Sequence, residues 1–127
     1  MLRRLISAGL IAVPVAFGFS AGPAIAGGAD VESVEVRRTG EDTYRFAVTV
    51  RHGDEGWDHY ANKWVVETMD GKLLDERVLY HPHVEEQPFT RSLSGVKIPP
   101  DIETVTVRAR DSVHGYEGRA MTVRVPD

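Results

Sequence analysis

The feature that most constrains this chain is an alternation of large apolar side chains with mostly polar ones from Thr43 to His52. A period of two is typical of an antiparallel strand that has one face in a core and the other in water. The apolar members of this strand are Tyr44, Phe46, Val48 and Val50. A chain with such a segment is expected to build a sheet around a packed core.

Six further segments have strand composition, and no stretch shows helical spacing. Asp70-Gly71 is a hairpin turn signal, and Trp64 lies on the third predicted strand. The six segments are Val31–Arg38, Lys63–Met69, Leu73–Tyr80, Pro88–Leu93, Glu103–Asp111 and Arg119–Val125. About seven short strands predict an all-β fold, an immunoglobulin-like or fibronectin-III-like antiparallel sandwich.

The N-terminal residues have the pattern of a secretory signal peptide. Two arginines, Arg3 and Arg4, precede an apolar run from Leu5 to Ala21, and Ala24-Ile-Ala26 is a small-x-small cleavage motif. We therefore expect residues 1–26 to be a signal peptide and residues 27–127 to be a single domain, periplasmic or secreted and without a membrane contact after cleavage. A retained single-span anchor is the less favoured alternative, and the choice between Sec and twin-arginine export stays open.

Composition excludes several classes of function. The chain contains no cysteine, which excludes disulfides, thiolate metal sites and thiol nucleophiles. Its net charge is −4, and its arginines are scattered, so it has no basic surface of the kind that binds nucleic acid.

All five histidines fall in three short stretches near the ends of predicted strands. Antiparallel strands joined by short loops place alternate loops at opposite ends of a sandwich. Loops 53–62, 81–87 and 112–118 therefore share one end, here called the histidine end. Imidazole is the commonest ligand of transition metals in proteins. The candidate metal ligands are His52, His59, His81, His83, His114 and Asp111.

The same loops contain other carboxylates and several aromatic side chains. The carboxylates predict either further ligands or groups that orient the imidazoles, and a solvated rim is the plainer alternative. The aromatic side chains are Trp57, Tyr60, Phe89 and Tyr116. They support a second hypothesis, a recognition module that binds a protein or small ligand without metal.

The order of these motifs resembles the desulfoferrodoxin or superoxide reductase domain, an immunoglobulin-like sandwich that holds iron with histidines and an axial cysteine. The resemblance covers about residues 50–118, and its sharpest part is Asp111-Ser-Val-His-Gly115, with Asp111 at the cysteine position. It implies that His52, His59 and His114 are iron ligands. The segments Gly56–Tyr60 and His81–His83 also resemble those of an exported bacterial β-sandwich family to which no activity attaches.

The leading hypothesis is an exported sandwich that binds one transition metal at the histidine end. Nitrogen and oxygen donors without sulfur suit Fe, Cu, Zn or Ni. Binding or delivery of the ion is favoured over catalysis, because a superoxide reductase needs the missing thiolate and a His–Asp hydrolase lacks a serine in a nucleophile motif.

Overall fold

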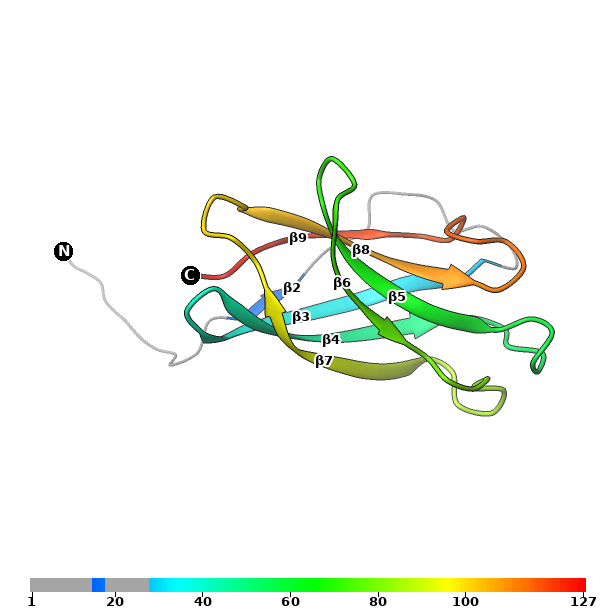
Figure 1. Cartoon of the computed structure of the whole chain (residues 1–127). Coiled ribbons are helices and arrows are strands. Elements are labelled where there is room, and N and C mark those ends of the chain that lie inside the picture. The colour runs from blue at the N-terminus through cyan, green and yellow to red at the C-terminus, as the bar shows by residue number, and fades with distance from the viewer. Residues whose placement is uncertain (1–14, 18–27) are drawn as a thin grey trace.

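The structure, a computed structural model, describes residues 15–17 and 28–127 of the chain (Figure 1). Every regular element among these residues is a strand. The strands are β2 (Val15–Phe17), β3 (Asp30–Gly40), β4 (Thr43–Arg51), β5 (Ala61–Thr68), β6 (Leu73–Val78), β7 (Phe89–Lys97), β8 (Thr104–Asp111) and β9 (Met121–Arg124). The described residues include no helix long and apolar enough to cross a membrane.

The strands form two antiparallel sheets that pack face to face, as Figure 1 shows. One sheet has the order β2-β3-β4-β7, and the other has the order β6-β5-β8-β9. With the short β2 set aside, this arrangement is a seven-stranded immunoglobulin-like sandwich. The predicted fold class is therefore confirmed.

The core lies between the sheets and is built by the alternation seen in the sequence. Along β4 every second side chain is buried, and β8 shows the same pattern. Trp64 of β5 and Phe46 of β4 are the largest of the side chains that are fully buried. The inward faces of both sheets are almost purely apolar. The register of each strand is therefore fixed, because a shift by one residue would expose these apolar side chains to water.

The predicted strand bounds agree with the observed ones to within a few residues. The largest shift is in β7, which ends at Lys97, beyond the predicted end at Leu93. Asp70 and Gly71 lie in the turn that joins β5 to β6, and Gly71 has a positive φ of 90°. The hairpin prediction is therefore also confirmed.

The predicted signal peptide lies mostly outside the described residues. Val15–Phe17 is the exception, and this segment pairs with Glu35–Arg37 at the edge of β3. Cleavage after Ala26 stays a prediction. If cleavage occurs, β2 leaves with the signal peptide, and β3 becomes an edge strand of the mature domain.

The three loops of the histidine end lie together, at the right of Figure 1 and at the end opposite the C-terminus. Hydrogen bonds join them directly. The main-chain N–H of Tyr60 donates to the Ser112 hydroxyl at 3.0 Å, and the N–H of His83 donates to Asp54 at 2.6 Å. The strand-direction argument therefore predicted this meeting of loops correctly.

Candidate metal centre

His52 and Asp111 continue the inward faces of two strands that belong to different sheets. In β4 the buried series Phe46, Val48 and Val50 runs on to His52, which is 2% exposed. In β8 the buried positions alternate in the same way up to Asp111, which is fully buried. The strand period thus places an imidazole and a carboxylate opposite each other, where the apolar core ends.

A tight turn after β8 fixes the orientation of the Asp111 carboxylate. Its Oδ1 accepts hydrogen bonds from the main-chain N–H groups of Val113 at 2.6 Å and His114 at 2.9 Å. The main chains of Asp111 and Gly115 also exchange two hydrogen bonds, at 2.8 and 2.9 Å. Because Oδ1 is held by the turn, Oδ2 is left to face the histidines.

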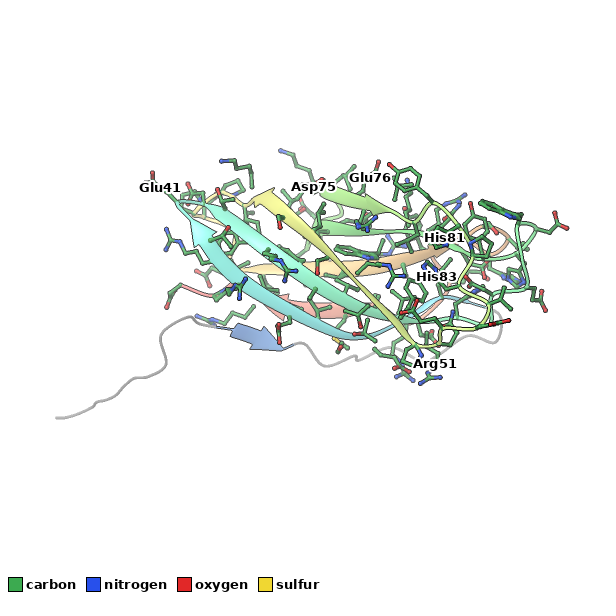
Figure 2. The ribbon with its side chains drawn as sticks, turned by 90° about the horizontal axis from the view of Figure 1, so that it is seen from below. Glu41, Arg51, Asp75, Glu76, His81 and His83 are labelled. Carbon is green, nitrogen blue, oxygen red and sulfur yellow. The ribbon has the colours of Figure 1, made fainter. Side chains whose placement is uncertain are left out.

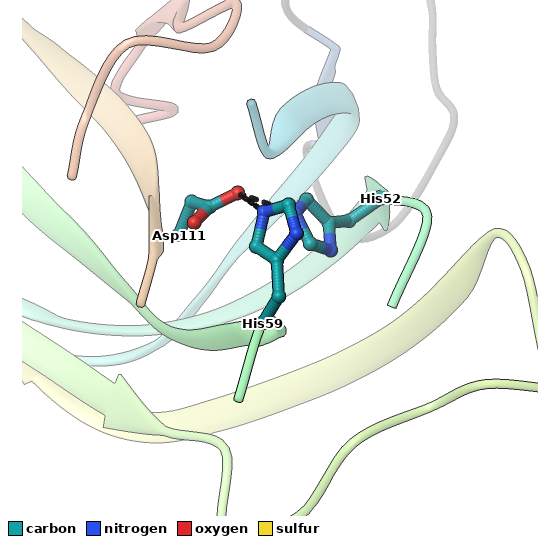
Figure 3. A group of neighbouring side chains, drawn as sticks. All are labelled: His52, His59 and Asp111. Atoms are coloured by element: carbon teal, nitrogen blue, oxygen red, sulfur yellow. Dashed lines mark hydrogen bonds and ion pairs between the residues drawn. The ribbon is translucent and has the colours of Figure 1, made fainter. Parts of the chain in front are cut away.

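Three imidazoles converge on this one oxygen atom. His52 Nε2 lies 2.5 Å, His59 Nε2 2.7 Å and His114 Nδ1 3.2 Å from Asp111 Oδ2. Figure 3 shows His52 and His59 pointing at the carboxylate from separate parts of the chain. We refer to these four residues as the Asp111 cluster.

Further carboxylates hold the far sides of two of the imidazoles. His52 Nδ1 contacts Asp54 Oδ1, and His59 Nδ1 lies 2.8 Å from Glu55 Oε1. A neutral imidazole carries only one N–H, so it cannot donate to two carboxylates at once. With a metal ion at Nε2, the remaining N–H on Nδ1 would donate to Asp54 or Glu55, which is the usual arrangement around histidine ligands.

Asp54 is buried and joins the cluster to two other segments. Its Oδ1 accepts the main-chain N–H of Ala61 at 3.2 Å, and its Oδ2 accepts that of His83. The main-chain N–H of His52 donates to Gln87 Oε1 at 2.9 Å, and Gln87 Nε2 donates to the His83 carbonyl. These bonds help to hold His52 in place from the loops on either side of it.

The environment of Asp111 favours its ionised form. Burial by itself raises the pKa of the carboxyl, because an ion is less stable away from water. The main-chain N–H groups of His114 and Val113 and the imidazoles of His52 and His114 outweigh burial and hold the pKa well below its usual range. Asp111 therefore carries a negative charge at neutral pH.

The donor atoms are close enough to hold one metal ion. Those of His52, His59 and Asp111 lie within 4.8 Å of one another. A tetrahedral ion at 2.0–2.2 Å from each donor keeps its donors about 3.4 Å apart. An ion would therefore replace the short contacts of His52 and His59 with Asp111 Oδ2 and move these atoms apart. The side chain of His59 is 18% exposed and that of His114 is 35% exposed. Access from solvent is therefore on their side of the cluster.

The structure brings four of the six predicted ligands together and leaves the other two apart. The His83 ring stacks on Phe89, with ring centres 4.1 Å apart, and His81 Nδ1 contacts the Pro82 carbonyl. Neither imidazole belongs to the group of donor atoms around Asp111. They line a separate hollow with Arg77 and Arg91.

Sequence reasoning missed the residues that tie the loops together. Gln87 and Ser112 bond across loops that are distant in the chain, and neither stands in a recognisable motif. Asp54 and Glu55 are among the carboxylates of the histidine end, but the sequence does not assign their histidine partners. His52 and Asp54 are two positions apart in the chain, and Glu55 and His59 are four apart; such short spacings are the signal that was available.

Fold and site together define an immunoglobulin-like sandwich with three histidines around a buried aspartate at one end. No protein-family model and no solved structure matches the chain. A curated protein of Halomicrobium mukohataei, named "Putative lipoprotein", is 42% identical over 95 residues, which are 75% of this chain and 46% of that protein. The chain thus spans about half the length of the curated relative that it matches.

Proposed function

We propose that this protein binds one divalent transition-metal ion through His52, His59, His114 and Asp111. The observation that carries the proposal is the convergence of three imidazole nitrogens on one oxygen of a fully buried carboxylate. Buried charges in proteins are paired or coordinate metals. The carboxylates behind His52 and His59 add support, because they orient Nε2 of both rings toward the same point.

Three nitrogen donors and one carboxylate oxygen suit Zn(II), Cu(II), Ni(II) or Fe(II). The resemblance to the superoxide reductase domain would favour iron, with Asp111 in place of the axial thiolate. A carboxylate is a harder donor than a thiolate and donates less electron density to iron. We therefore favour binding or delivery of the ion over superoxide reduction.

We further propose that the protein acts outside the cytoplasm, in the periplasm or as a secreted protein. The cationic, apolar and small-x-small order of residues 1–26 supports this location. The name of the Halomicrobium relative, a lipoprotein, agrees with export.

The first experiment measures metal content and affinity of the protein purified without a metal-affinity tag. Elemental analysis and competition titrations with Zn, Cu, Ni and Fe are compared for the wild type and for the His59→Ala/His114→Ala variant. These two imidazoles are partly exposed, so their removal leaves the packed part of the cluster in place. His81→Ala is the matched control, because His81 is an exposed histidine of the same end.

One equivalent of metal is expected in the wild type and in the control, with affinity at least about 100-fold lower in the double variant. Each lost nitrogen ligand removes a direct bond to the ion, whereas lost outer partners alone cost about 10–100-fold. A wild-type protein that takes up none of the four metals would overturn the proposal.

A recognition module without metal is the second candidate function, and exposed apolar side chains at the histidine end favour it. Trp57 is 67% exposed, Tyr80 75%, Val84 56% and Val113 59%; Trp57, Val84 and Val113 lie in the histidine loops, and Tyr80 directly precedes one of them. Exposed large apolar groups on one surface are typical of contact sites. This function predicts that Trp57→Ser abolishes partner capture and leaves metal affinity unchanged, as measured by pull-down and metal titration.

A further inference from the structure

A second polar site lies beside the Asp111 cluster and has the opposite charge preference. It is a hollow of about 90 Å³, lined by Arg77, Leu79, Tyr80, His81, His83 and Arg91, and is called here the His83 hollow. Figure 2 shows His81 and His83 next to each other at the histidine end. We propose that the His83 hollow binds a small oxyanion, the phosphate or carboxylate group of a ligand.

The first argument is the state of the His83 imidazole. The residue is 6% exposed, and neither of its ring nitrogens has a hydrogen-bond partner among the described residues. Buried polar atoms without a partner are rare in proteins, and each calls for a missing ligand or water. An oxygen atom in the hollow would accept the N–H of the neutral ring.

The second argument is the charge around the hollow. Arg77 donates to the carbonyls of Ser92 at 3.0 Å and Val78 at 2.6 Å, and no carboxylate within the described residues forms an ion pair with it. Arg91 pairs with Glu86 at 3.1 Å. Both guanidinium groups line the hollow and no carboxylate of the described residues does, whereas Asp54 and Glu86 act on His83 from outside the lining. An anion in the hollow would therefore contact positive groups.

The same charges argue against a metal ion in this hollow. His81 and His83 have ring centres 4.8 Å apart, but no carboxylate joins them as Asp111 joins the other histidines. A cation placed there would be repelled by Arg77 and Arg91, which line the same hollow. His81 and His83 therefore serve a different ligand from the one proposed for the Asp111 cluster.

The size of the hollow limits the ligand. About 90 Å³ is room for a few water molecules, or for one oxyanion group, and too little for a drug-sized molecule. Tyr80, which is 75% exposed, lines the hollow and places it within reach of solvent. The oxyanion is either a phosphate or a carboxylate, and the experiment distinguishes these two ligands.

The test titrates the full chain with inorganic phosphate and, separately, with acetate, and follows the imidazole resonances by NMR. Saturable shifts of the His83 and His81 resonances are expected with at least one of the two anions, and His81, which also lines the hollow, reports binding in a variant that lacks the His83 ring. His83→Phe keeps a flat ring to stack on Phe89 but has no ring nitrogen. Arg77→Gln removes one guanidinium. Each variant should weaken binding about tenfold or more, as loss of a hydrogen bond to a charged group does.

Arg45→Gln is the control, because Arg45 also bonds to Ser92, at the hydroxyl, but does not line the hollow. It should bind the anion as the wild type does. The titration is repeated in the His59→Ala/His114→Ala background, where anion binding should persist even if metal binding is lost. Absence of saturable shifts with both anions, equal weakening in Arg45→Gln, or stoichiometric Zn binding at His83 in that background would each overturn the proposal.

Discussion

At the scale of single residues, the cluster depends on side chains that do not reach the proposed metal position. The side chain of Glu55 is 71% exposed, and its carboxylate contacts the far nitrogen of His59. Asp54 has the same relation to His52 but is buried. The exposed member of this pair can be altered without disturbing the core, so it gives the cleaner test.

Glu55→Gln is expected to lower metal affinity about tenfold and to leave the free energy of unfolding nearly unchanged. The amide is a weaker acceptor than the carboxylate, so it holds the His59 tautomer less firmly and makes Nε2 a poorer ligand. Competition titration measures the affinity, and urea unfolding measures the stability. Glu85→Gln, an exposed acidic residue of the same end, should change neither quantity. Equal affinities for Glu55→Gln and the wild type would show that Glu55 does not orient His59.

His83 predicts a pH dependence of stability. Burial, followed by the charges of Arg91 and His81, lowers its pKa below the ordinary value of 6.5. Below pH 6.5 the unfolded chain therefore binds a proton that the folded chain does not. Stability from this residue is complete above pH 6.5 and decreases as the pH falls toward the folded pKa.

The check is urea unfolding at about pH 7.5 and about pH 5.5, a range that brackets the ordinary histidine pKa. The buffers contain no phosphate or carboxylate. The His83→Phe variant should lose less stability than the wild type between these two pH values. The opposite ranking would mean that the folded state favours the charged ring.

At the scale of elements, the strands were predictable because burial repeats every two residues. The alternation of β4 and β8 identified their inward faces and, by extension, the positions of His52 and Asp111. The ends of strands were predicted less well, because main-chain pairing extends β7 to Lys97 through residues with no apolar period.

The candidate site was predictable only as far as strand direction reaches. Strand direction predicted that all three histidine loops lie at one end of the sandwich. It did not predict which side chains of these loops point inward. His81 and His83 lie in a segment without regular structure, so no period fixed the orientation of their rings. The His83 ring stacks on Phe89, and the main-chain N–H of His83 donates to Asp54. These two contacts hold the His83 ring away from Asp111. A sequence does not display either contact.

The turn from Asp111 to Gly115 is a second element that can be tested. Gly115 has a φ of 67°, and a Cβ added there would contact nothing within 4 Å. Gly115→Ala should therefore cost about 1–2 kcal/mol through backbone strain alone. It should also lower metal affinity, because the turn carries His114.

Gly53→Ala is the matched control for this change. A Cβ at Gly53 also contacts nothing within 4 Å, and its φ is not positive. Urea unfolding and metal titration of the two variants check the prediction. A Gly115→Ala protein as stable as Gly53→Ala would show that the turn relaxes without strain.

At the scale of the whole molecule, the proposed metal would join the two sheets. His52 extends β4 in one sheet, and Asp111 ends β8 in the other. An ion bound only by the folded chain stabilises it by about 2.7 kcal/mol at a free concentration 100 times its Kd.

For a domain of about 100 residues, this gain corresponds to a rise in Tm of roughly 10–20 °C. Thermal unfolding with and without the metal, and again after addition of a chelator, measures the effect. The His59→Ala/His114→Ala variant should show little of this rise. An unchanged Tm in the wild type at saturating metal would mean that the ion binds the unfolded chain equally well or not at all.

The pairing of His52 with Asp111 has a further meaning for a chain without cysteine. Counted from β3, β4 and β8 are the second and sixth strands of the sandwich, the same pair that a disulfide joins in antibody domains. Here the connection is a hydrogen bond between His52 and Asp111. Unlike a disulfide, it needs no oxidising surroundings to form, and the proposed ion would make it responsive to competing ligands for metal.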